Sequence, residues 1–188
     1  MTENEGNGGV RRGNGWRGAG WGAACVLFLL PVIGELVTDE MNWGAEDFII
    51  FGAMLAAAGG AFELAVRMSA STAYRVGVGV ALATSFILVW MNLAVGIIGS
   101  EDNPANLMYA GVLAIGIVGA LIARFRPHGM ARALVATAIA QALVGLIALV
   151  AGWGFVLILT AGFVALWLLS AWLFRKAGRE QTSARTAS

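Results

Sequence analysis

The chain has 188 residues, of which 59% are hydrophobic and 12% are charged, with a formal net charge of +1. Soluble domains average about 45–50% apolar and about 25% charged residues, so this chain carries too little charge to cover a water-exposed surface. The composition excludes a soluble globular protein and predicts an all-α integral membrane protein whose excess apolar side chains face lipid.

The chain begins with a polar, glycine-rich stretch over residues 1–20, whose composition predicts a flexible tail. The first apolar run follows at 21–37 and contains Cys25, which is the only cysteine and so forms no intrachain disulfide. Basic residues ahead of a short apolar run are also typical of a cleaved signal peptide. The run ends in a stretch with polar residues, from Glu35 to Asp39, without a small-residue cleavage site, and this favours a retained anchor.

Five further apolar runs follow, each of about 19–23 residues, which suffices at about 1.5 Å per residue to cross a hydrocarbon core of about 30 Å. Between the last two runs, Trp153 lies between two glycines, which predicts a tight turn rather than one helix of double length. Residues 175–188 form a basic tail. The predicted transmembrane domain covers residues 21–174, with segments at about 21–37, 48–66, 76–98, 105–123, 133–152 and 154–174.

The charged residues are segregated by sign, and this sets the predicted orientation. Lys and Arg total 12, and all of them fall on one side of a six-helix arrangement. The loops on the other side hold carboxylates and no base. The positive-inside rule places the basic side, with both termini, in the cytoplasm. A five-helix arrangement would scatter the basic clusters over both faces, so the sequence predicts six helices arranged as three hairpins.

The two loops on the acidic side hold six carboxylates and form a candidate metal site. Oxygen-rich clusters suit a hard cation such as Ca²⁺ or Mg²⁺, although the spacing matches no EF-hand loop. The alternative is helix capping, because Asn103 before Pro104 is typical of a helix start, and acidic residues before the second segment would complement its dipole. The candidate ligands are Asp39, Glu40, Glu46, Asp47, Glu101 and Asp102.

Four polar residues within the apolar segments are candidates for a role inside the membrane. Glu63 is the only carboxylate well inside a segment, and Arg67 follows four residues later on the same helical face. This spacing predicts a local ion pair, with a proton-relay carboxylate as the alternative. Asn92 and Gln141 lie on faces of small residues, where amides bond across helix contacts. The alternative is that Glu63, Asn92 and Gln141 line a substrate path.

Several classes of function are excluded by residues that the chain lacks. His128 is the only histidine, so a single-chain bis-histidine haem site or a multi-histidine metal centre cannot form. Lys176, the only lysine, lies outside the segments, which excludes a retinal-type Schiff base. No phosphate-binding P-loop, dinucleotide fingerprint or nucleophile elbow occurs. The sequence therefore predicts no enzyme activity and no cofactor. Topology accounts for the basic loops without nucleic-acid binding, and these loops would also attract anionic lipid headgroups.

The loop Thr-Asp-Glu-Met-Asn-Trp at 38–43 and the stretch Gly-Ser-Glu-Asp-Asn-Pro-Ala-Asn-Leu-Met-Tyr at 99–109 resemble those of an uncharacterised group of bacterial inner-membrane proteins. The resemblance implies a multi-pass protein of the bacterial inner (plasma) membrane and says nothing about mechanism. The residues favour an interaction or accessory component of the lipid bilayer, forming a homo-oligomer or binding a partner membrane protein through small-residue helix faces. A small transporter or channel is the alternative, and a divalent-cation-responsive protein acting through the acidic loops is a further one.

Overall fold

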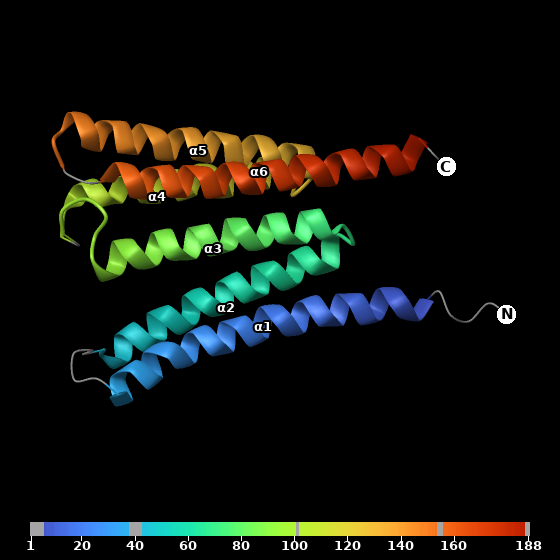
Figure 1. The fold of residues 1–188 in the computed structure, drawn as a ribbon, viewed down its shortest axis with the longest axis horizontal. Helices are drawn as coiled ribbons and strands as arrows, with labels where there is room; N and C mark the ends of the chain where they lie inside the picture. The colour runs from blue at the N-terminus through green and yellow to red at the C-terminus, as the bar shows by residue number, and fades with distance from the viewer. Residues whose placement is uncertain (1–5, 38–42, 101, 154–155, 187–188) are drawn as a thin grey trace. The chain divides into compact units, whose positions relative to one another are not determined.

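The computed structural model describes residues 6–37, 43–100, 102–153 and 156–186. Within these ranges the chain is all-α, with turns and one short 3-10 helix between the α-helices (Figure 1). Six of the described segments are long and apolar enough to cross a membrane by length and composition, which confirms the predicted class. The elements are α1 (Gly6–Val37), α2 (Ala45–Met68), α3 (Thr72–Ala94), η1 (Pro104–Asn106), α4 (Leu107–Ile122), α5 (Pro127–Val150) and α6 (Val156–Thr186).

The chain divides into two compact units, and the first of them, Met1–Ala70, contains α1 and α2. These two helices run antiparallel along one another, as a hairpin requires (Figure 1). Aromatic side chains hold them together, since Phe28 of α1 stacks on Phe51 of α2 with ring centroids 6.4 Å apart. Gly52 allows this close approach, because a Cβ at that position would lie 3.1 Å from the Phe28 ring.

The second unit, Ser71–Ser188, contains the other four helices, and of its two predicted hairpins only that of α5 and α6 packs as a pair. The sequence predicted that α3 and α4 would form one hairpin and α5 and α6 another. In the structure α5 packs between α4 and α6, and α3 packs along α6. Helices α3 and α4 are joined by a short loop but make few contacts with each other. The predicted hairpin of α3 and α4 is therefore wrong as a packed unit, although the chain does reverse direction there.

Small residues explain this order of packing. The Ser170 hydroxyl of α6 is fully buried and donates a 2.7 Å hydrogen bond to the Gly77 carbonyl of α3. Next to it, the Tyr74 and Phe174 rings meet edge to face with centroids 5.0 Å apart. On the far side of α5, a Cβ on Gly119 of α4 would lie 2.7 Å from the Ala133 Cβ, so only glycine admits so close an approach. Small residues thus bring α3 to α6 and α4 to α5.

Helix continues into both predicted tails, of which only the N-terminal one, residues 1–20, was predicted to be flexible. Helix α1 begins at Gly6, and α6 continues to Thr186. Contacts account for part of the difference. Trp16 of α1 lies 6.4 Å from the Phe62 ring of α2, centroid to centroid, and Ala177 of α6 is fully buried. Packing of this kind stabilises a helix that glycine-rich sequence alone would not hold.

The loop between α3 and η1 is organised by Asn106. Its side-chain oxygen accepts hydrogen bonds from the backbone N–H groups of Ile97 (3.1 Å) and Ile98 (2.9 Å), and its amide nitrogen donates to the Ser100 carbonyl at 2.7 Å. Helix α3 therefore ends earlier than predicted, because these bonds take the backbone out of the helix. The Asn103 side chain accepts from the Ala105 N–H at 3.0 Å, which confirms the predicted cap.

Candidate functional site

Glu63 lies on α2, in the first unit, and both oxygens of its carboxylate accept hydrogen bonds. The predicted ion pair with Arg67 is present. Two further partners come from α1, because Arg17 donates to the same carboxylate oxygen at 2.7 Å and the Trp21 indole N–H donates to the other at 2.9 Å. The sequence predicted neither of these two contacts, because contacts between helices cannot be deduced from spacing within one helix. Glu63 therefore fastens α1 to α2 as well as pairing with its own helix.

Asn92 and Gln141, the two amide candidates, lie in the second unit. The Asn92 amide donates a 2.8 Å hydrogen bond to the Leu88 carbonyl of its own helix, so the expected bond across a helix contact is not formed. Gln141 has an exposed fraction of 0%, and neither its oxygen nor its nitrogen has a partner among the described residues. It lies on the buried face of α5, as its small-residue neighbours predicted.

The acidic loops are described only in part. Asp39, Glu40 and Glu101 lie outside the described residues. Glu46 and Asp47 lie in the first turn of α2, where Asp47 accepts a 2.9 Å hydrogen bond from the Gly44 N–H, so the predicted capping role is confirmed for Asp47. Among the residues that the structure describes, no three His, Cys, Asp or Glu side chains come together as a metal site would require. The cation hypothesis stays a prediction.

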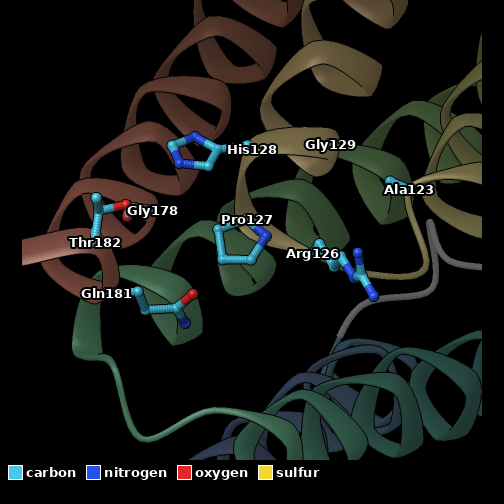
Figure 2. Close-up of a pocket in the computed structure, with 8 residues that line it drawn as sticks. All are labelled: Ala123, Arg126, Pro127, His128, Gly129, Gly178, Gln181 and Thr182. Atoms are coloured by element: carbon cyan, nitrogen blue, oxygen red, sulfur yellow. Dashed lines mark hydrogen bonds between the residues drawn. The ribbon is translucent and has the colours of Figure 1, made fainter. Parts of the chain in front are cut away.

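Two adjacent pockets lie where α5 begins and the last turns of α6 pass it, and they share His128. Figure 2 shows the residues that line the first of them. We call these pockets the N-terminal pocket and the arginine pocket. The N-terminal pocket has a volume of about 530 Å³ and the arginine pocket about 610 Å³. Neither lining includes a carboxylate. The N-terminal pocket is lined by Ala123, Arg126, Pro127, His128, Gly129, Gly178, Gln181 and Thr182, and the arginine pocket by His128, Ala131, Arg132, Arg175 and Arg179.

The turn that precedes α5 positions one side of the N-terminal pocket. Arg124 and Phe125 both adopt left-handed backbone angles, with φ of 49° and 58°. The Phe125 N–H bonds to the Ala120 carbonyl at 3.2 Å, which ends α4. The Phe125 carbonyl accepts a 2.9 Å hydrogen bond from the Tyr74 hydroxyl of α3. This fixed corner sets Arg126 as the N-cap residue of α5, so that its side chain lies at the pocket.

His128 separates the two pockets by packing directly on α6. A Cβ on Gly178 would lie 2.6 Å from the imidazole Cε1 and 2.8 Å from Nδ1, so glycine at this position lets the ring lie directly against α6. Figure 2 shows the ring turned toward the α6 turn that carries Gly178 and Thr182. Gly178 is buried beneath it, while His128 itself stays exposed to solvent. The imidazole therefore forms a wall common to both pockets.

The side chains around the pockets create an electropositive surface. Among the described residues, no carboxylate forms an ion pair with any of the four lining arginines. The acid nearest in sequence, Glu180, accepts a 3.0 Å hydrogen bond from the Ser71 hydroxyl. In the sequence, topology and attraction to anionic lipid headgroups explain the basic loops, and neither predicts that these arginines line pockets. A signal was present in the four-residue spacings from His128 to Arg132 and from Arg175 to Arg179, because each spacing puts two bases on one helical face.

Comparisons of the chain with protein-family models, with curated proteins and with solved structures give no match. The resemblance of the two loops to a bacterial inner-membrane group therefore receives no support from them. What the structure supports is the broader class, a multi-pass protein with six helices apolar enough to lie in a lipid bilayer.

Proposed function

We propose that the protein is an interaction or accessory component of the bacterial inner membrane, without enzyme activity and with both termini in the cytoplasm. The segregation of basic and acidic residues supports this orientation. In its bilayer the protein packs against other membrane helices, a second copy of the chain being the simplest partner.

The observation that carries this proposal is the state of the polar residues inside the helices. Glu63 is held by donors from two helices, Asn92 bonds to its own helix, and Gln141 is sealed in the core of its unit. A transporter or channel needs such groups to face a path that solvent or substrate can enter. Side chains engaged in packing support the accessory function over that alternative.

Open small-residue positions support an interaction role. At Gly60 on α2, Gly111 on α4 and Gly162 on α6, a Cβ would meet no described atom within 4 Å, and all three positions are exposed. Positions of this kind allow the backbone of another transmembrane helix to approach closely. The other face of α4 is different, because Gly116 and Gly119 already pack on α5.

The orientation is tested by reporter fusions. Reporters placed after residue 42 or 103 should behave as periplasmic, and reporters after 70, 128 or 180 as cytoplasmic. A cytoplasmic reporter at 103 would contradict the six-helix orientation.

The interaction role is tested by oxidative crosslinking in native membranes. The natural thiol is first removed by Cys25→Ser, and a cysteine is then introduced singly by Gly60→Cys, Gly111→Cys or Gly162→Cys. At least one of the three should give a disulfide-linked pair of copies, because these backbones are open to a neighbour. Ala138→Cys is the control, since Ala138 is buried within its own unit and should not crosslink. Absence of crosslinking at all three positions, with each thiol still reactive, would contradict self-association.

A further inference from the structure

We propose that the two pockets beside His128 bind a phosphate-bearing anion, which is either a lipid headgroup or a soluble phosphate compound. Both pockets are hollows between α5 and α6 that are lined by bases and by no acid. Volumes of about 530 and 610 Å³ are ample for a phosphate group and its nearest substituents. This inference goes beyond the proposed function, which assigns no ligand.

The N-terminal pocket lies over the positive end of a long helix. Its lining includes Arg126, the N-cap residue of α5, and the first three residues of that 24-residue helix. The backbone N–H groups of a first helical turn have no acceptor within the helix, and the helix dipole adds a partial positive charge there. No side chain caps this helix. The N–H groups of His128 and Gly129 are thus available to an anion, in the manner of phosphate sites at helix N-termini.

The arginine pocket supplies positively charged groups that suit the same ligand. Arg132 extends from α5, and Arg175 and Arg179 from successive turns of α6. Guanidinium groups present N–H donors in a planar fork that matches phosphate oxygens. Since these three form no ion pair with a described carboxylate, no internal charge competes with an incoming anion.

The position of the pockets along the helices fits a ligand at the membrane surface. The N-terminal pocket is at the first turn of α5, and the arginine pocket is beside the stretch of α6 where basic residues replace the apolar run. Both therefore lie at a boundary between hydrocarbon and water, where lipid phosphates are found. Basic pockets between transmembrane helices at this depth bind acidic phospholipid headgroups, and a soluble phosphate compound would reach them from the aqueous side.

The proposal is tested with the purified full-length protein in dodecyl maltoside, whose headgroup contains no phosphate. One arm adds inorganic phosphate, with sodium chloride of equal ionic strength as its control. The other arm adds phosphatidylglycerol to the micelles, with oleate as an anionic control that lacks phosphate. Melting temperature is followed against ligand concentration, because a ligand that binds only the folded form stabilises it by RT ln(1 + [L]/Kd), so the melting temperature continues to rise as ligand is added.

Matched variants distinguish binding in the two pockets from a general effect of positive surface charge. Arg126→Gln and Arg175→Gln remove a lining base from each pocket, and each should weaken binding about tenfold, as expected for loss of one charge-assisted contact. Arg124→Gln is the control, because Arg124 is an exposed base of the same turn that lines neither pocket. It should bind like the parent protein.

The outcomes show whether the pockets bind a phosphate group and whether that group comes from a lipid or from a soluble compound. Stabilisation by phosphatidylglycerol alone assigns the site to a lipid headgroup, and stabilisation by inorganic phosphate as well assigns it to a phosphate group from either source. Equal effects of phosphate and chloride, together with equal effects of phosphatidylglycerol and oleate, would overturn it. So would a loss of binding in Arg124→Gln as large as that in Arg126→Gln.

Discussion

Replacing Gln141 by methionine should make the protein more stable. Gln141 is fully buried in α5, and neither polar atom of its amide has a partner among the described residues. Burying an amide in this state costs about 1–3 kcal/mol. Methionine has a similar length and volume, and a volume-conserving exchange costs less than about 1.5 kcal/mol. The difference predicts that Gln141→Met increases the free energy of unfolding by about 1 kcal/mol.

The measurement is equilibrium unfolding in mixed dodecyl maltoside and sodium dodecyl sulfate micelles, followed by tryptophan fluorescence. Gln181→Met, studied in phosphate-free buffer, is the control, because Gln181 is exposed on α6 and the same chemical change there should alter stability by less than about 0.5 kcal/mol. A clear loss of stability in Gln141→Met would refute the reasoning. It would mean that the amide has a partner in the folded protein, such as a bound water or ligand, and a polar path through the second unit would regain support.

Three further predictions test the packing. Gly145→Ala should lower the free energy of unfolding by about 1–3 kcal/mol, because the new Cβ would lie 2.5 Å from a Thr160 methyl group. Gly111→Ala, at an open position, should raise the free energy of unfolding by about 0.5–1 kcal/mol. Equal effects of the two variants in the same unfolding assay would contradict the α5–α6 contact. Tyr74→Phe should cost about 1 kcal/mol through loss of its hydrogen bond to the α4–α5 turn, and an unchanged unfolding free energy would show that bond to be dispensable. Glu63→Gln and Arg17→Gln should each lower the melting temperature, and the double variant should lower it by less than the sum of the two single effects. Strictly additive effects would contradict the Arg17–Glu63 ion pair between α1 and α2.

Much of the fold could be predicted from the sequence because its signals are local. A run of apolar residues long enough to cross the bilayer predicts a helix whatever lies beside it, and all six such runs are helical within the described residues. The Asn103 cap and the Glu63–Arg67 pair are equally local, since each depends on residues two to four positions apart.

The pairing of helices could not be predicted, because it depends on residues far apart in the chain. The bond from Ser170 to Gly77, which joins α6 to α3, links positions that no periodicity relates. The same is true of the contacts from Arg17 and Trp21 to Glu63. The N-terminal tail was predicted to be flexible because glycine lowers helix propensity. The contacts that stabilise a helix there come from another helix, and composition does not reveal them.

The arginine-lined pockets illustrate how one set of residues can serve two roles that the sequence does not separate. The positive-inside rule requires only that a base lie at the cytoplasmic end of a transmembrane segment, and it does not depend on which surface the side chain lines. The N-terminal pocket borders a corner with two consecutive left-handed residues, Arg124 and Phe125, after which α5 begins. Such a backbone costs about 1–2 kcal/mol for each non-glycine residue. The chain uses glycine for positive φ elsewhere, at Gly96, Gly99 and Gly152, but not at this corner. Neither Arg124 nor Phe125 lines either pocket, so the left-handed backbone of this corner acts by placing the next residue, Arg126, which does.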